Sequence, residues 1–343
     1  MKTLVLGNFG YNTNKLDGQT IKTRNIYELL SSKVIDAISY FDTSSLKQNK
    51  FRIFIMLYQV CMCDRLVYLP AHGNLRFLFP IIYLFSLCFR FKILYVVIGG
   101  WLVEFLSNKP LHRFCLRKIT VICTETKLMQ KNLMEAYSFS NVIVLPNFRK
   151  LANSLEKKNV NISQNKLNIV FMARIQMKKG LDYIEDICKY ISAARFDDKI
   201  QIDFYGQVDE IDSAFFKEMV EQYPFVRYLG ALLPQQIHRT LSQYDILLLL
   251  THYYTEGFPG TILDAYIAGI PVIVTNWKHA HEFVDDKKTG YIVPFKNGTD
   301  KVVNILTSLV KNKSVLQPMK QAAKSKSFEF SEEAVWNTLS CYF

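Results

Sequence analysis

Short apolar runs rich in β-branched residues recur along the whole chain of 343 residues, and longer helix-like stretches separate them. Strands that alternate with helices in this way form parallel sheets whose two faces are both covered by helices. The pattern therefore predicts an α/β protein with two doubly wound, Rossmann-like sheets. In chain order the runs are 3–7, 34–40, 65–69, 93–98, 120–123, 141–145, 168–172, 200–205, 226–229, 245–250, 271–274 and 290–293.

A polar stretch over residues 150–166 separates the two halves of this pattern. It is rich in Asn, Lys and Ser and has no apolar periodicity, which is typical of a linker. We therefore expect two domains, residues 1–150 and 167–330, and a helix over 331–343 that crosses back to pack on the first domain. Ligands of doubly wound sheets bind at the carboxyl ends of the strands, so two such sheets facing each other would hold a ligand in the cleft between them.

Composition narrows the class of protein and its compartment. Half of the residues are hydrophobic and 21% are charged, which is typical of a globular chain. The seven cysteines are scattered, without paired CxxC spacing or a Cys/His cluster, so neither a zinc site nor a disulfide framework is predicted. The N-terminus lacks the apolar core and cleavage site of a signal peptide. We expect a cytoplasmic protein.

The net charge of +12 is confined to one half of the chain. Residues 1–150 hold 20 Lys and Arg against 8 Asp and Glu, whereas residues 151–343 hold 22 of each kind. A one-sided excess of positive charge favours an anionic partner, which includes membranes, nucleic acids and acidic substrates. The alternative is a solvated basic surface that serves solubility alone.

The basic half also contains an apolar segment, whose uncharged core spans residues 77–89. Its 13 residues are fewer than the roughly 20 that a transmembrane helix needs. Because the segment is apolar nearly all round, it is either buried in the fold or partly faces lipid, with Arg76, Arg90 and Lys92 reaching towards headgroups. Burial over most of its length is the favoured interpretation.

A segment in the second half combines two carboxylates with a turn. Glu256 and Asp264 flank a Gly-Phe-Pro-Gly turn that follows the apolar run 245–250 and opens a short helix, expected to end near Gly269. Backbone N–H groups at such a helix N-terminus favour an anion, and neighbouring carboxylates accept hydrogen bonds from hydroxyls. The pair of features suggests a sugar phosphate or a nucleotide. A strand-turn-helix unit without a ligand is the alternative.

Three motifs together resemble a known family. They are residues 171–180, with Arg174 and a Lys-Gly pair at its end, the element from Glu256 to Asp264, and residues 141–148, with a Pro-Asn bend. In this order the motifs resemble those of the family 4 retaining glycosyltransferases (glycosyl transferases group 1) of bacterial polysaccharide biosynthesis, which have the GT-B fold. The resemblance runs along the whole chain, although the first half is weakly patterned.

The resemblance implies roles for residues of the second half. Arg174 and Lys179 would neutralise the leaving diphosphate, and Glu256 would hydrogen-bond the transferred sugar; these three are the expected catalytic residues. Asp264, where the family usually has Glu, would accept from the ribose hydroxyls. The other expected donor-binding residues are Gly257, Phe258, Pro259, Gly260, Thr261, Gly206, Gly230 and Ala231. The resemblance implies no metal and no cofactor, with a UDP- or GDP-linked sugar as a substrate.

The acceptor side would come from the first domain. Residues 7–20 resemble the family's loop that closes over the phosphates, which implicates Gly18, Gln19 and Thr20. The place where the family often carries a His reads Gly100-Trp101, without one, whereas His72 follows a different strand and could enter the cleft. This departure favours a front-face reaction, in which the departing phosphate accepts the acceptor's proton.

The sequence as a whole predicts a retaining, metal-independent hexosyltransferase. Its acceptor would be a glycan or lipid-linked saccharide at the cytoplasmic membrane face, with peripheral contact to an anionic membrane. Two alternatives stay open: a soluble transferase for a protein or small molecule, and a catalytically silent partner subunit that binds a sugar nucleotide. A nucleic-acid-binding protein is disfavoured because no zinc finger, helix-turn-helix or stacking motif is present.

Overall fold

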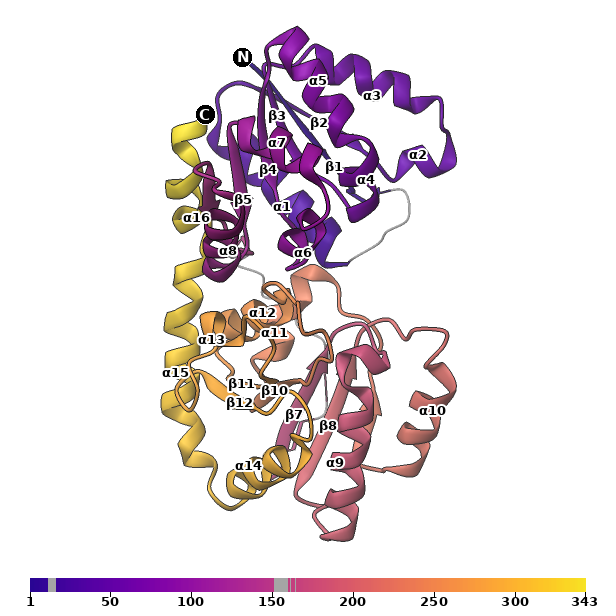
Figure 1. Cartoon of the computed structure of the whole chain (residues 1–343). Coiled ribbons are helices and arrows are strands. Elements are labelled where there is room, and N and C mark those ends of the chain that lie inside the picture. The colour runs from indigo at the N-terminus through magenta and orange to yellow at the C-terminus, as the bar shows by residue number, and fades with distance from the viewer. Residues whose placement is uncertain (12–16, 151–159, 161, 164) are drawn as a thin grey trace. The chain divides into compact units, whose positions relative to one another are not determined.

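The computed structural model describes residues 1–11, 17–150, 160, 162–163 and 165–343, so most of the predicted linker lies outside the described residues. The chain forms two compact units, Met1–Lys150 with Glu332–Phe343, and Leu151–Ser331 (Figure 1). Each unit holds one six-stranded sheet in which every strand pair is parallel. The predicted α/β class with two doubly wound sheets is confirmed.

The sheet of the first unit has the strand order β2-β1-β3-β4-β5-β6. Its second strand begins three residues later than predicted, because Val34 caps α1 and its N–H bonds the carbonyl oxygen of Leu30 at 2.9 Å. The strands are β1 (Lys2–Gly7), β2 (Ala37–Asp42), β3 (Arg65–Leu69), β4 (Lys92–Val96), β5 (Val121–Thr124) and β6 (Val142–Val144).

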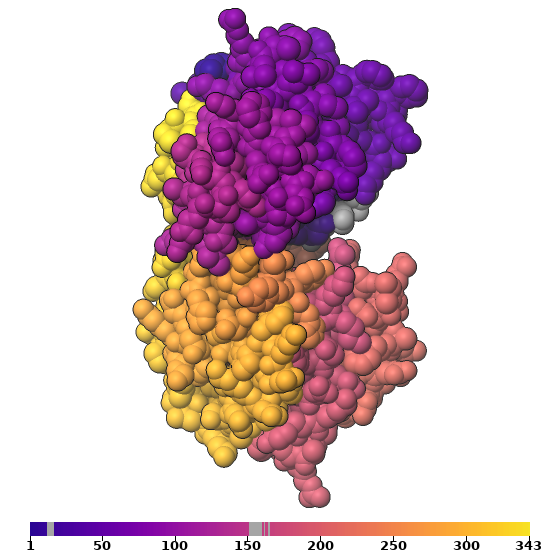
Figure 2. Space-filling view, in the orientation of Figure 1, coloured from indigo at the N-terminus to yellow at the C-terminus, as the bar shows by residue number. Residues whose placement is uncertain are grey.

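Helices cover both faces of this sheet. One face is covered by α1 (Gly18–Lys33) and α16 (Glu332–Leu339), and the C-terminal residues lie against the first unit (Figures 1 and 2). The other face is covered mainly by α3, α5, α7 and α8, which bury one side of each helix against β1, β3, β4 and β5. These and the short helices of the unit are α2 (Ser45–Gln48), α3 (Arg52–Cys61), α4 (His72–Phe77), α5 (Phe79–Phe89), α6 (Leu102–Leu106), α7 (Pro110–Lys118), α8 (Lys127–Tyr137) and η6 (Ser340–Tyr342).

The apolar segment 77–89 corrects one expectation. It is not buried over most of its length, because α5 buries Phe79, Ile82 and Tyr83 against the sheet while Leu84 and Leu87 on other sides are exposed. The sheet, α3 and α7 contact part of the helix, and the outward residues Ile81, Leu84 and Leu87 stay exposed among the described residues. Among the described residues, none of the helices combines the length and apolar character that a membrane crossing requires.

The sheet of the second unit has the order β12-β11-β10-β7-β8-β9. Its strands are β7 (Leu167–Met172), β8 (Ile200–Tyr205), β9 (Val226–Tyr228), β10 (Ile246–Leu249), β11 (Val272–Thr275) and β12 (Gly290–Val293). One apolar core lies under α9 (Leu181–Ala193), α10 (Ser213–Gln222) and α14 (Thr299–Lys311). The core on the opposite face lies under α11 (Ile237–Leu241), α12 (Gly260–Ala268) and α13 (Ala280–Phe283), and α15 (Leu316–Ser327) contributes to both. The 3-10 helices are η2 (Met177–Lys179), η3 (Pro234–Gln236), η4 (Lys313–Val315) and η5 (Phe328–Phe330).

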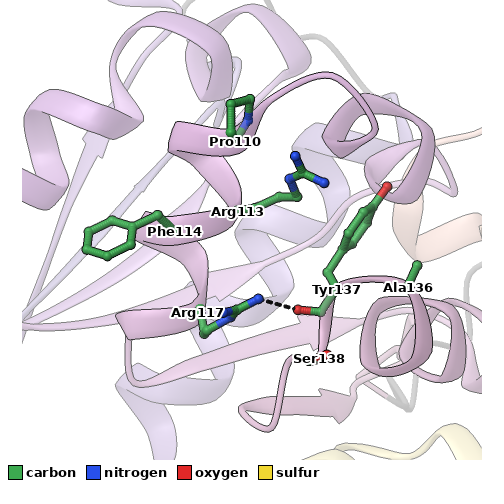
Figure 3. A pocket seen from close by; sticks show the side chains of 7 residues that line it. All are labelled: Pro110, Arg113, Phe114, Arg117, Ala136, Tyr137 and Ser138. Atoms are coloured by element: carbon green, nitrogen blue, oxygen red, sulfur yellow. Dashed lines mark hydrogen bonds between the residues drawn. The ribbon is translucent and has the colours of Figure 1, made fainter.

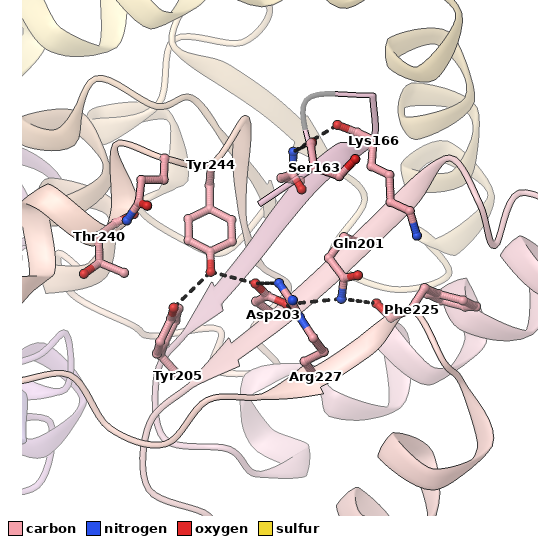
Figure 4. Close-up of polar contacts among 11 residues, drawn as sticks. Ser163, Lys166, Gln201, Asp203, Tyr205, Phe225, Arg227, Thr240 and Tyr244 are labelled. Carbon is pink, nitrogen blue, oxygen red and sulfur yellow. Dashed lines mark hydrogen bonds and ion pairs between the residues drawn. The ribbon is translucent and has the colours of Figure 1, made fainter. Parts of the chain in front are cut away.

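A buried polar network joins three segments of this sheet (Figure 4). Asp203 on β8 is fully buried and receives two hydrogen bonds of 2.7 Å from the Arg227 guanidinium of β9 and one of 2.7 Å from the Tyr244 hydroxyl. The Tyr205 hydroxyl lies 3.0 Å from that of Tyr244, and burial raises the pKa of Tyr205 to about 12. Because every member is paired, the network fixes β8 and β9 relative to the segment with Tyr244 that leads into β10.

Candidate active site

The second sheet has a topological switch point between β7 and β10. The chain runs outwards from β7 to β8 and β9 on one side, whereas β10, β11 and β12 extend the sheet on the other side. Loops that follow two such strands diverge and leave a crevice at their carboxyl ends, where ligands of doubly wound folds bind. Arg174 and Lys179 follow β7, and Glu256 follows β10, so the fold brings the two predicted motifs to this point.

Lys179 and Glu256 form a close ion pair. The Lys179 Nζ lies 2.7 Å from each oxygen of the Glu256 carboxylate, and the two side chains are 16% and 18% exposed. The Thr251 hydroxyl donates to Glu256 Oε2 at 3.0 Å, and the Thr275 hydroxyl donates to the Thr251 carbonyl at 2.8 Å. The Lys179 ammonium also lies 5.2 Å from the ring centroid of Tyr253. The carboxylate is therefore held in place before any ligand arrives.

Gly180 explains how Lys179 comes so close to β10. Its φ is +88°, and a Cβ at this position would collide with the carbonyl oxygen and carbon of Leu250. Only glycine accepts both the left-handed backbone and the close approach. The His252 N–H then bonds the Lys178 carbonyl at 3.0 Å, which links η2 to the segment after β10.

The turn between Glu256 and Asp264 opens α12, as the sequence predicts. The N-cap residue Pro259 makes no side-chain cap, although its carbonyl accepts the Ile262 N–H at 3.1 Å, so the N–H groups of Gly260 and Thr261 are left at the helix N-terminus without an intrahelical partner. The Thr261 hydroxyl is shielded from solvent and has no hydrogen-bond partner among the described residues. Gly257 and Pro259 are buried, and the Phe258 ring stacks on Phe283 at 3.9 Å. Phe258 can therefore offer a ligand only its backbone.

Asp264 lies one turn into α12 and is 4% exposed. The Nε2 of His238, on α11, is 3.1 Å from Asp264 Oδ1. His238 is not among the predicted residues, since it stands in no motif and the packing of α11 against α12 brings it to the carboxylate. The helix ends where predicted, at Gly269, whose φ is +75°.

The other predicted donor-binding residues lie along the same edge of the sheet. Arg174 is exposed two residues after β7. Gly206 directly follows β8 with φ +139°, and a Cβ there would collide with the carbonyl oxygen of Ala173. Gly230 and Ala231 follow β9, and the Gly206 N–H bonds the Gly230 carbonyl at 3.1 Å. The edge is therefore built from closely packed loop backbones.

The predicted acceptor residues lie at the carboxyl edge of the first sheet, after β1, β3 and β4. Gly18, Gln19 and Thr20 form the first turn of α1, which Asp17 caps by accepting the Thr20 N–H at 2.9 Å. Residues 12–16 of the predicted phosphate loop lie outside the described residues. Within the described part of the chain, the ring contacts of His72 are with Trp101 and Phe105 and not with this turn.

His72 instead packs on the loop after β4. Its ring centroid is 4.9 Å from that of Trp101, whose indole N–H donates to the Ile98 carbonyl at 2.8 Å. Gly100, between Ile98 and Trp101, is buried.

A buried ion pair that the sequence did not predict links the segments at the carboxyl edge of the first sheet. Lys22 Nζ lies 2.6 Å from Glu125 Oε1 and 3.0 Å from the Val97 carbonyl, which ties α1 to the segments after β4 and β5.

Comparison with known proteins places these features in context. A family model described as glycosyl transferases group 1 matches residues 153–326. An N,N'-diacetylbacillosaminyl-diphospho-undecaprenol alpha-1,3-N-acetylgalactosaminyltransferase from Campylobacter jejuni is 27% identical over 252 residues, which are 74% of this chain and 60% of that protein. The capsular polysaccharide biosynthesis glycosyltransferase CapM from Staphylococcus aureus is 24% identical over 247 residues, 67% of this chain and 62% of that one. An uncharacterised 41.2 kDa protein from the cps region of Klebsiella pneumoniae is 28% identical over 169 residues, which are 49% of this chain and 44% of that protein.

The match thus spans less than two thirds of the length of each of these relatives. Among solved structures, that of the Anabaena protein HepE in complex with UDP has a TM-score of 0.74 at 15% identity and covers 100% of this chain and 99% of that one. Sucrose-phosphate synthase from Thermosynechococcus elongatus has a TM-score of 0.74 at 13% identity, and the match covers 99% of this chain and 98% of that one. At such identities the likeness concerns the fold, and the predicted GT-B fold is confirmed.

Proposed function

The chain belongs to the glycosyl transferases group 1 family, and from this premise we propose that it is a retaining, metal-independent hexosyltransferase. In the proposed reaction a hexose moves from a UDP- or GDP-linked donor to a glycan or lipid-linked saccharide. The observation that carries the proposal is the pair of Lys179 and Glu256 at the switch point, with Glu256 four residues before α12 begins. The cation and the helix N-terminus offer contacts to a diphosphate, and the carboxylate offers contacts to a sugar.

The positive groups would stabilise the leaving diphosphate. Negative charge grows on the phosphates as the glycosidic bond breaks, and fixed donors aimed at that charge lower the barrier. The three N–H donors of an ammonium let Lys179 keep its contact with Glu256 while it donates to a phosphate oxygen. The exposed Arg174 and the N–H groups at the start of α12 would supply the remaining contacts.

The two carboxylates would divide the hydroxyls of the donor. Glu256 would accept from hydroxyls of the transferred sugar, in the orientation that Thr251 and Lys179 impose. Asp264 would accept from the ribose, with His238 holding its carboxylate. With the charges arranged in this way, the departing phosphate accepts the proton of the acceptor hydroxyl in a front-face reaction.

The acceptor is proposed to be lipid-linked and to be met at the cytoplasmic face of a membrane. Support comes from the Campylobacter relative, whose name specifies a diphospho-undecaprenol-linked substrate. The excess positive charge of residues 1–150 also favours an acceptor or surface that carries phosphate.

A thermal-shift screen tests donor binding directly. The full chain is heated with UDP, GDP and ADP and with their glucose and N-acetylglucosamine derivatives. A ligand at a hundred times its Kd stabilises the native state by about 2.7 kcal/mol, so one nucleotide series should raise the melting temperature by several degrees. No shift with any of them would contradict the proposal.

Substitutions test the roles of the pair. Lys179→Ala and Glu256→Gln should each lower the rate of nucleoside diphosphate release from the donor by roughly 10²- to 10³-fold, as loss of one transition-state contact does. Lys178→Ala is the matched control, because this neighbouring lysine is exposed and should leave the rate nearly unchanged. An equal loss in both lysine variants would argue against a specific phosphate contact. The anomeric configuration of the product, read by NMR, tests retention.

A further inference from the structure

The first unit exposes an apolar stripe along α3. Phe51, Phe54, Ile55 and Tyr58 are spaced as one side of a helix and are between 51% and 78% exposed. The opposite side of the helix buries Met56 and Val60 in the core. Large apolar side chains gathered on one side mark a contact surface more often than scattered single ones do.

The next helix on this face repeats the arrangement. Ile81, Leu84 and Leu87 of α5 are 45% to 60% exposed, and Phe79 and Ile82 on its other side are fully buried. The two helices lie side by side in the upper part of Figure 1. The exposed apolar surface therefore continues from one helix to the next.

The third helix, α7, adds apolar and basic side chains. Leu111 and Phe114 are 57% and 58% exposed, and α7 packs directly on α5 through the edge contact between Phe114 and Tyr83. All three helices bury their inner sides in the same core, on one face of the first sheet. Their outward sides therefore point to the same side of the unit and form one surface.

The charge around this surface is strongly one-sided. Residues 43–118, which contain the three helices, hold 11 Lys and Arg but only 2 Asp and Glu, and α3, α5 and α7 contain no acidic residue. Arg52, Arg76 and Arg90 are all exposed beside the apolar stripes. Their long side chains can keep an apolar stem near the stripe and place the charge at its rim.

A pocket of about 320 Å³ opens beside Phe114, between α7 and the end of α8 (Figure 3). Arg113 and Arg117 line it from α7, and Tyr137 lines it from α8. Arg117 donates to the Tyr137 carbonyl at 2.7 Å, and the Arg113 guanidinium lies 5.5 Å from the Tyr137 ring centroid. Within the described part of the chain, neither guanidinium forms an ion pair with a carboxylate. Two arginines in one pocket favour an anion with several oxygens, such as a phosphate.

We propose that the outward sides of α3, α5 and α7 form a membrane-docking face, which inserts its apolar side chains into an anionic bilayer surface and binds a lipid phosphate at Arg113 and Arg117. This docking face rests on the proposed function, because it is the surface through which the transferase would meet the membrane that holds its acceptor. At 11 residues α5 is too short to cross a bilayer, so the helices lie in the interface.

An anionic bilayer fits this face better than a second copy of the chain does. Self-association through the face would bring two clusters of Arg and Lys together, and like charges that meet across an interface oppose binding. An anionic bilayer offers apolar acyl chains to the stripes and negative charge to the basic rim at the same time.

Vesicle flotation of the full chain, without any sugar nucleotide, tests the proposal. The chain should float with vesicles of phosphatidylcholine mixed with phosphatidylglycerol, and at least tenfold less with phosphatidylcholine alone. Phe54→Ser combined with Leu84→Ser and Leu87→Ser should lower the floated fraction at least tenfold. Ile211→Ser combined with Phe328→Ser removes exposed apolar side chains of the second unit and should leave flotation unchanged.

The basic pocket is tested in the same assay. Arg113→Gln combined with Arg117→Gln should weaken binding to the anionic vesicles severalfold, whereas Lys217→Gln, on the exposed side of α10, should not. Melting temperatures of all variants, with and without nucleoside diphosphate, check that fold and donor site are intact. Because flotation needs no transfer reaction, a failed donor screen and a failed flotation are distinguishable.

Two results would overturn the proposal. One is flotation that the triple substitution leaves unchanged. The other is a chain that does not float and sediments as a dimer, which the triple substitution converts to a monomer, since the face would then be covered by a second copy.

Discussion

Replacement of Gly180 is the substitution whose effect follows most directly from the structure. A Cβ would meet the Leu250 backbone, and φ is +88°, so Gly180→Ala should destabilise the chain by about 2 to 4 kcal/mol and misplace Lys179. Gly73→Ala, within α4, meets nothing within 4 Å and should leave stability unchanged or raise it slightly. Urea unfolding measures both, and equal effects would show that the close approach at Gly180 does not exist in solution.

His238 is the second residue with a specific expectation. Its Nε2 lies 3.1 Å from Oδ1 of the buried Asp264 carboxylate and so helps to orient it. His238→Ala should raise the KM for the nucleotide sugar about tenfold and change kcat little, because the contact orients a group that binds the donor in the ground state. His238→Gln, which can still donate a hydrogen bond, should restore most of the affinity. Arg239→Ala, exposed on the same helix, is the matched control.

At the residue scale, motifs predicted some of the site and geometry supplied the rest. The order of the motifs placed Lys179 and Glu256 in one site, and the structure brings their charged groups to 2.7 Å. Thr251 and His238 belong to no motif, because one lies at a strand end and the other reaches Asp264 only through helix packing. Contacts of this kind depend on tertiary structure, which local sequence does not encode.

At the element scale, most strands could be predicted because they are buried on both faces, whereas the edge strand β2 exposes half of its residues and was the one whose start was predicted three residues too early. Strands buried on both faces are near-continuous apolar runs bounded by turns, and all twelve predicted runs contain an observed strand or most of one. The helix α5 shows the limit of this approach. It is apolar nearly all round, so its pattern does not reveal which side packs on the sheet and which side has no neighbour.

Asp245 links three elements and should make the second unit sensitive to acid. It accepts the Asn168 N–H at 2.9 Å and pairs with Lys313 and Lys320 at 2.8 and 3.3 Å. Burial alone would raise its pKa, but the Lys313 hydrogen bond, the Asn168 N–H and the two ammonium charges together lower it below 3.8. A lowered pKa contributes stability that is complete above the ordinary value and is lost as the pH falls through the folded-state value.

Asp245→Asn should therefore cost about 2 kcal/mol at pH 7, and the difference from the unsubstituted chain should narrow as the pH falls below about 4. Melting temperatures between pH 3 and pH 7 measure it. Asp198→Asn is the control, since this exposed carboxylate pairs with its exposed neighbour Lys199 and its loss should change stability little. A difference that stays constant over this pH range would contradict the assigned role of the carboxylate.

At the scale of the whole molecule, the chain leaves the first unit at Lys150 and returns to it at Glu332. Val335 and Leu339 of α16 are 2% exposed in the core shared with α1 and β1. Arg65 at the start of β3 donates to the Phe343 carbonyl at 2.9 Å, and its guanidinium lies 5.4 Å from the Phe343 ring centroid. The stability of the first unit therefore depends on residues that begin 182 positions after Lys150 (332 − 150).

Removal of residues 332–343 should act on the first unit alone. Loss of Val335 and Leu339 exposes apolar surface worth on the order of 4 kcal/mol, so amide hydrogens of β1 and β3 should exchange markedly faster. Those of β7 and β10 should keep their protection, because the second unit has its own core. Hydrogen exchange read by mass spectrometry separates the two units within one sample.

Val335→Ala combined with Leu339→Ala should reproduce part of the effect, whereas Glu333→Gln, at an exposed residue of the same helix, should not. Faster exchange in both units to the same extent would mean that the two sheets unfold as one cooperative structure, contrary to the division into two units.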